Sequence, residues 1–237
     1  MPVYFASDMH LRLDKPERGR RFARFVEGLG SDDPLYLVGD ICDFWYVARQ
    51  HRGGPFQCEG LRALGEFRER GGALTILTGN HDQWMGAFYE DVLGARMVAE
   101  PYVVEAHGLR ISLEHGHRTG GTQPWKAWME SRAFLAAFER LPGDVAASLE
   151  HMLERSNAKK RDADEARMVE VFRSHLGSVK GDVDVAVFGH VHTPLDDSAG
   201  RPRMVILGGW HERSSFLRVD EEGATLVVET VESAAPA

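Results

Sequence analysis

The sequence of 237 residues contains only two cysteines, Cys42 and Cys58. A chain of this length with so few cysteines cannot depend on a disulfide framework, and such usage is typical of proteins in a reducing cytosol. Their separation also excludes a zinc ribbon, because each cysteine of such a site has a close partner in the chain. We therefore interpret both as ordinary small residues of a cytoplasmic protein.

Long apolar segments and an excess of basic residues are missing as well. No stretch approaches the roughly 20 apolar residues that cross a bilayer, and the N-terminus lacks the pattern of a signal peptide. Any membrane contact would therefore be peripheral, at the inner membrane. The formal net charge of −8 argues against general nucleic-acid binding, since proteins of that class present a basic surface.

Short apolar segments alternate with helical patterns along the first third of the chain. Three strands are predicted at 3–7, 35–38 and 74–78, and helical patterns over 16–29 and 55–70 separate them. An order of this kind is typical of a largely parallel sheet with helices against it. The sequence therefore predicts an α/β fold.

The second half has a different organisation. A predicted hairpin over 102–114 is followed by a long segment of helical composition, a strand at 183–188, and then short strands of antiparallel type at 204–207, 215–219 and 224–231. Breaks in the helical segment predict three helices, at 124–140, 143–155 and 162–176. We predict a single domain over residues 1–237 with a helical insert at about 122–178, beside the functional site.

Polar side chains follow five of the predicted strands. They form the segments Asp8-x-His10, Gly39-Asp40-x-x-Asp43, Gly79-Asn80-His81-Asp82, His115-Gly116-His117 and Gly189-His190-x-His192. Alternate side chains of a strand share a face, so pairs such as Asp8 and His10 can point at one centre. The ends of strands are also where open α/β sheets place their active sites. We therefore expect the five segments to converge, with Asp82 stabilising its own turn.

The donor groups in these segments are carboxylate, imidazole and amide oxygen, without thiolate. This set suits Mn, Fe, Zn or Mg rather than a structural zinc site. The candidate ligands are too many for one ion, so we predict two divalent ions that share a bridging carboxylate. The seven ligands are Asp8, His10, Asp40, Asn80, His115, His190 and His192. Asp40 is the expected bridge, because it follows a predicted central strand and has two oxygens.

Such a pair of ions predicts phosphoester chemistry. Two cations polarise a phosphoryl group and lower the pKa of a bridging water from 15.7 towards about 7, which makes hydroxide available for in-line attack on phosphorus. His81 adjoins a predicted ligand and could protonate the leaving oxygen or stabilise its charge. Asp43 could accept the other N–H of His81 and thereby orient the ring.

In this order the motifs resemble those of the calcineurin-like metallophosphoesterases, from Asp8 to His192. The resemblance implies a four-layer α/β/β/α sandwich of two mixed sheets. It implies one metal held by Asp8, His10, Asp40 and His192. It implies a second metal held by Asp40, Asn80, His115 and His190. It also makes His81 the catalytic histidine, supported by Asp43.

A narrower resemblance is to the UDP-2,3-diacylglucosamine pyrophosphohydrolases of lipid A synthesis. The strand at residue 3, the segment G-D-I-C-D-F-W, the helical segment after H-G-H and the late L-G-G-W-H carry it. These enzymes usually use manganese, release UMP and an acylated sugar 1-phosphate, and bind acyl chains with the insert. Many of them have arginine in place of His81, and they usually have H-G-D, with a carboxylate beside the substrate, in place of the segment ending in His117.

The predicted insert carries apolar side chains at helical spacing. They are Trp125, Trp128, Phe134, Leu135, Phe138, Leu141, Leu149, Met152 and Leu153. These side chains either pack within the domain, as amphipathic faces usually do, or leave an acyl groove in which Trp125 contacts the substrate. Similarly, Asn157, Lys159 and Lys160 lie at a helix break, where they either meet phosphate or uridine or form a solvated turn.

Three functions follow as hypotheses. The first is a cytoplasmic hydrolase with two divalent ions, Mn²⁺ first among them, that cleaves UDP-2,3-diacylglucosamine to UMP and 2,3-diacylglucosamine 1-phosphate. The second is a phosphatase or phosphodiesterase that acts on a soluble nucleotide or a phosphoprotein. The third is an inactive scaffold of the same fold that binds a partner, against which the complete ligand set argues, since a scaffold has no need of it.

Overall fold

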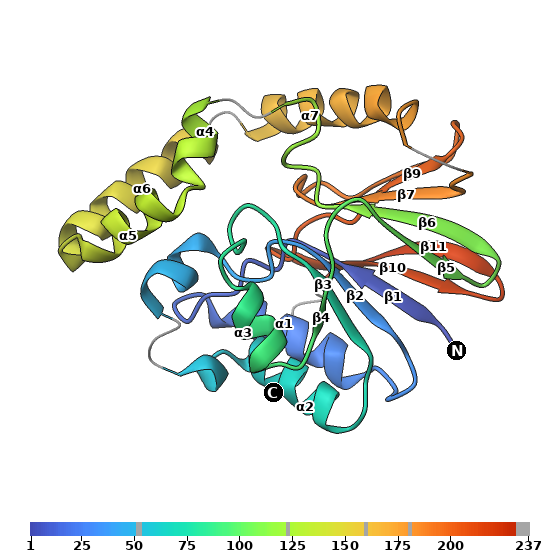
Figure 1. Ribbon diagram of the computed structural model, residues 1–237, viewed down its shortest axis with the longest axis horizontal. Helices are drawn as coiled ribbons and strands as arrows, with labels where there is room; N and C mark the ends of the chain where they lie inside the picture. The colour runs from blue at the N-terminus through green and yellow to red at the C-terminus, as the bar shows by residue number, and fades with distance from the viewer. Residues whose placement is uncertain (51–53, 122–123, 159–160, 180–181, 231–237) are drawn as a thin grey trace.

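The computed structural model describes residues 1–50, 54–121, 124–158, 161–179 and 182–230. Two mixed β-sheets face each other in it, with helices on both outer sides (Figure 1). The larger sheet has the order β11-β10-β1-β2-β3-β4. Its strands are β1 (Val3–Ala6), β2 (Leu35–Val38), β3 (Leu74–Leu77), β4 (Arg96–Met97), β10 (Arg213–Asp220) and β11 (Gly223–Thr230).

The smaller sheet has the order β5-β6-β7-β9-β8. Its strands are β5 (Tyr102–Ala106), β6 (Leu109–Glu114), β7 (Val185–Phe188), β8 (Leu195–Asp197) and β9 (Arg203–Ile206). Strand β9 pairs in parallel with β7 and only β8 is antiparallel to it, so the expectation that all late strands are antiparallel is wrong for β9. The short return strand β8 reverses the chain and has no alternating pattern that would predict it.

Alternating side chains of the strands build the layers. In β1, Phe5 packs between the two sheets with Val38 of β2 and Val187 of β7. The neighbouring Ala6 points to the opposite face and joins the cluster under the helices α1 (Pro16–Glu27) and α2 (Glu59–Glu69). The predicted β-α-β-α-β order is thus confirmed, and its helices form one outer layer.

The segment between β6 and β7 is helical, and its helices take two positions in Figure 1. They are α4 (Pro124–Met129), α5 (Arg132–Arg140), α6 (Gly143–Ala158) and α7 (Arg161–Leu176). The first predicted helix is divided in two, because Ser131 caps α5 by accepting the backbone N–H of Phe134. Helices α5 and α6 project from the body, whereas α7 covers the outer face of the smaller sheet.

Packing attaches this segment at both positions. In α7, the ring of Phe172 stacks on Phe188 of β7 with 4.3 Å between ring centroids. In α5, Phe138 is buried against Phe44 and Trp45, which lead into the π-helix η1 (Tyr46–Gln50). The layers α1/α2, larger sheet, smaller sheet and α7 form the four-layer α/β/β/α sandwich that the motifs implied. Within the described ranges, no helix has both the length and the apolar character of a membrane span.

Candidate metal centre

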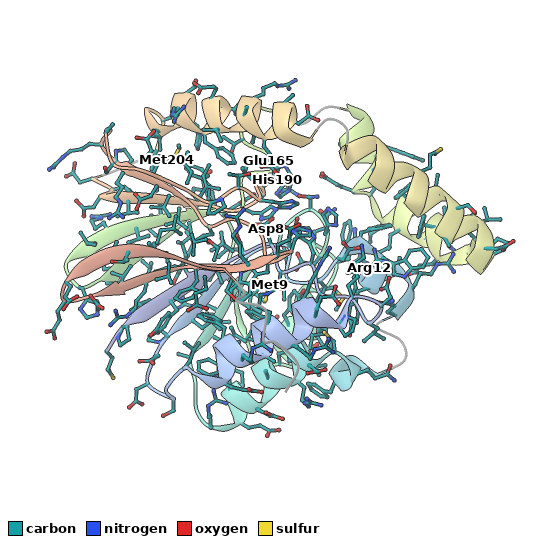
Figure 2. The ribbon with its side chains drawn as sticks, turned by 180° about the vertical axis from the view of Figure 1, so that it is seen from behind. Asp8, Met9, Arg12, Glu165, His190 and Met204 are labelled. Atoms are coloured by element: carbon teal, nitrogen blue, oxygen red, sulfur yellow. The ribbon has the colours of Figure 1, made fainter. Side chains whose placement is uncertain are left out.

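The ends of five strands bring the polar segments together at one edge of the two sheets. Asp8 follows β1 and His190 follows β7, and Figure 2 shows them close to each other although one comes from each sheet. Four residues of these turns have positive φ, namely Asp8 (57°), His10 (46°), Asp40 (52°) and His190 (65°). This conformation is uncommon outside glycine and asparagine, and such strain concentrates at functional sites.

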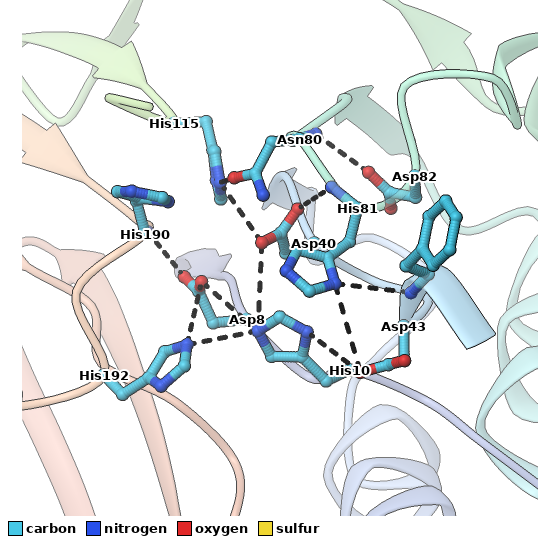
Figure 3. A network of polar contacts seen from close by, with 12 residues as sticks. Asp8, His10, Asp40, Asp43, Asn80, His81, Asp82, His115, His190 and His192 are labelled. Carbon is cyan, nitrogen blue, oxygen red and sulfur yellow. Dashed lines mark hydrogen bonds and ion pairs between the residues drawn. The ribbon is translucent and has the colours of Figure 1, made fainter. Parts of the chain in front are cut away.

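One group of donors surrounds a single point near β1 (Figure 3). The Nε2 atoms of His10 and His192 are 3.1 Å apart. The Oδ1 atom of Asp8 lies 3.7 Å from the first of these nitrogens and 3.8 Å from the second. Three donor atoms at these separations can ligate one divalent cation.

A second group lies next to the first. It consists of Asp40, His115 and His190, with the Asn80 Oδ1 atom 3.3 Å from His115 Nε2. The Nδ1 atom of His115 is 2.9 Å from the carbonyl oxygen of Val38. Donation to this carbonyl puts the proton on Nδ1 and leaves Nε2 free to face a cation.

Asp40 connects the two groups through one oxygen. Its Oδ2 atom lies 3.8 Å from His10 Nε2 and 3.4 Å from His115 Nε2. Its Oδ1 atom accepts the backbone N–H of His81 at 2.9 Å. The sequence-based argument for a bridge depended on two free oxygens, but the geometry shows Oδ2 alone between the groups and Oδ1 held by the backbone.

Asp82 joins the loops that carry the candidate ligands. Its carboxylate accepts the backbone N–H groups of Gly79 and Ile41, each at 2.8 Å, and that of Cys42 at 3.3 Å. The hydroxyl of Tyr89 donates to the same carboxylate at 2.8 Å. Asp82 therefore does stabilise its own turn, as expected, and it also attaches that turn to the loop after β2.

Glycines allow these loops to approach one another. A Cβ atom at Gly79 would lie 2.1 Å from Asp40 Oδ1, and one at Gly39, whose φ is 82°, would lie 2.4 Å from His115 Nδ1. Contacts this short are sterically forbidden, so the close packing of the ligand loops requires glycine at both positions.

The residues of the centre fit a pair of divalent cations. The Asp8 Oδ1 and His10 Nδ1 atoms are buried without a hydrogen-bond partner among the described residues. Buried polar atoms of this kind need a partner, because their desolvation is otherwise uncompensated. The donors are carboxylate, imidazole and amide, and this set suits Mn, Fe, Zn or Mg.

Burial and mutual charges shift the pKa values of these groups in opposite directions. Burial raises the pKa of Asp8 to about 6, whereas the surrounding histidines outweigh burial at Asp40 and hold its pKa well below the usual value. Burial lowers the pKa of His10 and His190 well below the ordinary value, so both rings are neutral. At His115, burial is outweighed by Asp40, and the pKa rises to about 10, so ligation of a cation through Nε2 would release a proton from that atom.

His81 lies at the open side of the centre, and about a third of its side chain (34%) is exposed. The backbone N–H of Phe44 is 3.3 Å from His81 Nδ1, so Nδ1 is an acceptor and Nε2 carries the proton of the neutral ring. Asp43 Oδ2 is 4.0 Å from the same Nδ1 atom, beyond hydrogen-bond distance, and is closer to His10 Nδ1, at 3.7 Å. Burial lowers the pKa of His81, but Asp40 and the other nearby carboxylates outweigh it and raise the pKa above its ordinary value.

Comparison with known proteins agrees with this geometry. The chain matches the calcineurin-like phosphoesterase family over residues 1–194. This chain belongs to that family. Members of the family bind two divalent metal ions, and the chain is a metal-dependent phosphoester hydrolase.

Individual relatives extend the match to nearly the whole phosphoesterase. A UDP-2,3-diacylglucosamine hydrolase of Hahella chejuensis is 26% identical, covering 96% of this chain and 97% of the relative. A protein of the same name from Stenotrophomonas maltophilia is 29% identical, covering 95% and 98%. Among solved structures, an archaeal phosphodiesterase is similar at 15% identity with a TM-score of 0.48, covering 96% of this chain and 99% of its own.

The predicted substrate-binding residues of the phosphoesterase do not all lie in one place. One is near the centre, two lie in helices between β6 and β7, and two lie outside the described residues. His117 is buried beside His115, with 5.4 Å between ring centroids, and burial lowers its pKa to about 3, so the ring is neutral. The backbones of Trp125 and Asn157 lie in α4 and α6. The two lysines, Lys159 and Lys160, lie outside the described residues.

Several residues at the centre were not predicted from their motifs. Glu100 accepts the backbone N–H of His115 at 2.7 Å, and the His211 ring lies 4.7 Å from that of His192. Glu165 of α7 lies beside His192 as well. His211 follows the strand-end segment L-G-G-W, which is a recognisable signal, but Glu100 and Glu165 stand in segments without any local pattern.

Proposed function

We propose that this phosphoesterase hydrolyses the pyrophosphate bond of UDP-2,3-diacylglucosamine, giving UMP and 2,3-diacylglucosamine 1-phosphate. The supporting observation is the extent of the similarity, since relatives named UDP-2,3-diacylglucosamine hydrolase match 93% to 96% of the chain. These matches include the helices between β6 and β7, whereas motifs shared by all phosphoesterases are confined to the strand ends.

In this proposal the seven predicted ligands hold two divalent cations, with Mn²⁺ as the first choice. The first cation takes Asp8, His10, Asp40 and His192. The second takes Asp40, Asn80, His115 and His190. When bound, such cations neutralise phosphate charge and acidify water. The protein itself contributes the orientation of the donors, through the backbone hydrogen bonds to Asp40 and His115.

His81 acts on the leaving group in this proposal. Its Nε2–H is the free donor of the ring, because Nδ1 already accepts the Phe44 N–H. The leaving group is a sugar 1-phosphate, and the second pKa of a phosphate monoester is about 6. A hydrogen bond to the developing negative charge is therefore sufficient, and complete proton transfer is not required. Asp43 supports this arrangement from between His10 and His81 by its charge.

The helical insert provides a surface for the acyl chains. Phe138 and Ala146 are buried where α5 and α6 pack on the domain, as amphipathic helices usually do. Trp128 and Met152, in contrast, are 60% and 59% exposed. Exposed large apolar side chains on the insert are suited to a substrate that joins fatty acyl chains to a charged nucleotide. Such a substrate would bring the enzyme to a membrane surface peripherally.

The deciding experiment measures UMP release from UDP-2,3-diacylglucosamine by the full chain with Mn²⁺. UDP-N-acetylglucosamine, which lacks the acyl chains, serves as the matched control. The proposal predicts UMP from the lipid substrate and at least ~10²-fold less from the control. If the lipid yields no UMP while bis-p-nitrophenyl phosphate or a simple nucleotide is cleaved, the proposed substrate is wrong, and the enzyme is a phosphodiesterase of soluble substrates.

A further inference from the structure

Helix α7, the last helix of the insert, reaches the metal centre. Figure 2 shows Glu165, near its N-terminal end, on the side of the helix that faces the sheets, where His190 and Asp8 are also labelled. Phe172, about two turns further along the helix, is fully buried against Phe188 of β7, and Arg173 forms an ion pair with Asp197 of β8 at 3.0 Å. The helix is therefore attached to the smaller sheet, and the position of Glu165 is defined by this packing.

Glu165 makes two contacts with the loop after β7. Its Oε2 atom accepts a hydrogen bond from the Thr193 hydroxyl at 2.6 Å. Its Oε1 atom lies 3.9 Å from His192 Nδ1. Only 15% of the Glu165 side chain is exposed, whereas its neighbour Asp164 is an exposed residue. The carboxylate is thus held by Thr193 with its other oxygen directed at the imidazole.

The two nitrogens of His192 face different partners. Nε2 lies in the centre, 3.1 Å from His10 Nε2 and 3.8 Å from Asp8 Oδ1. Nδ1 faces away from the centre, towards Glu165. A neutral imidazole can ligate a cation through Nε2 only when its proton is on Nδ1, and a carboxylate near Nδ1 favours that tautomer. Carboxylates commonly orient metal-ligating histidines in this way.

We propose that Glu165 is a positioning residue of the metal centre: its carboxylate keeps the proton of His192 on Nδ1 and leaves Nε2 free to ligate a divalent cation. The proposal rests on the role of His192 as a ligand in the proposed function. Its consequence is that a helix of the insert, which is separated from the metal motifs in the sequence, orients one of the ligands.

The first test measures the tautomer of His192 in the metal-free full-length protein. Long-range ¹H–¹⁵N spectra of the ring nitrogens, assigned by comparison with His192→Ala, should show the wild-type proton on Nδ1. In Glu165→Ala the proton should move to Nε2, the usual position in an isolated neutral imidazole. Asp164→Asn removes a charge from the adjacent, exposed position of the same helix and should leave the spectrum unchanged.

The second test measures Mn²⁺ affinity by competition with a chelator. Glu165→Ala should lower the affinity for one of the two ions by about 10- to 100-fold, because the loss of an orienting partner typically has this effect. The affinity for the other ion should stay within twofold of wild type. Glu165→Gln retains an oxygen acceptor and should fall between wild type and Glu165→Ala. Thr193→Val removes the hydroxyl that holds the carboxylate and should weaken the same ion, with an unchanged melting temperature.

The outcomes separate this proposal from the proposed substrate. If the Glu165→Ala variant keeps the wild-type tautomer of His192 and binds Mn²⁺ within twofold of the wild-type affinity, the positioning role is overturned. Retention of both ions by His192→Ala would overturn it together with the ligand assignment. If the tautomer and affinity change as expected while the lipid substrate yields no UMP, the positioning role stands and the substrate proposal fails.

Discussion

Asp82 provides the sharpest test of how the ligand loops are held, because it acts through the fold and has no predicted contact with a metal or a substrate. Its buried carboxylate accepts three backbone N–H groups and the hydroxyl of Tyr89. We expect Asp82→Ala to destabilise the protein strongly, since these four donors remain buried and lose their acceptor.

The magnitude follows from these contacts. A hydrogen bond to a charged acceptor contributes about 1.5–3 kcal/mol, and a buried donor left without a partner costs about 1–3 kcal/mol. The sum is reduced because burial disfavours the carboxylate itself, as its raised pKa indicates. We therefore expect Asp82→Ala to lower the free energy of unfolding by about 4 kcal/mol, similar to breaking a buried ion pair. Tyr89→Phe, which removes one donor, should lower it by about 1 kcal/mol.

Urea denaturation in the presence of a chelator measures this difference without any contribution from metal binding. With an m-value of about 3 kcal/mol per M, a loss of about 4 kcal/mol lowers the midpoint by about 1.3 M. The exposed Asp91 is the matched control, and Asp91→Ala should stay within about 0.5 kcal/mol of wild type. A loss below about 1 kcal/mol for Asp82→Ala, with an unchanged m-value, would refute the reasoning that Asp82 holds the loops together.

The remaining predictions concern the centre itself. His81→Ala should reduce kcat at least about 10²-fold with two Mn²⁺ still bound, because the side chain acts on the leaving group and not on the ions. Asp40→Ala should weaken the binding of both ions, measured by chelator competition, since Oδ2 lies between the two donor groups. Gly79→Ala should lower both thermal stability and metal content, because its Cβ would overlap Asp40 Oδ1. Gly86, where an added Cβ meets nothing within 4 Å, is the control.

Each of these predictions can fail clearly. Loss of one Mn²⁺ in His81→Ala would show that His81 is a ligand. This outcome is worth measuring because His81 forms a group of possible metal donors with His10 and Asp40. Full occupancy of both sites in Asp40→Ala would exclude it as the bridge. Equal melting temperatures and metal contents for Gly79→Ala and Gly86→Ala would show that the loops tolerate a larger separation than their contacts indicate.

The sequence alone determined the strands and the turns that end in donor residues. Strands such as β1 and β7 are short apolar segments, and donors directly after them must lie at the ends of the sheets. Local periodicity and chemistry were therefore sufficient to predict the α/β class, the first three parallel strands and the set of residues that the structure brings together. The resemblance added the two-sheet sandwich, which periodicity did not predict.

Tertiary structure alone decided how these residues are held. Asp82 meets the loop after β2 across 41 residues of sequence, and Glu165 contacts His192 from a helix that no metal motif includes. The parallel pairing of β9 with β7 and the single free oxygen of Asp40 depend equally on the packing of distant segments. Contacts between distant segments produce no periodic pattern in the sequence, because they depend on which residues the fold brings together in space. The donor residues of this centre can thus be recognised from local motifs, whereas their orientation depends on the folded chain.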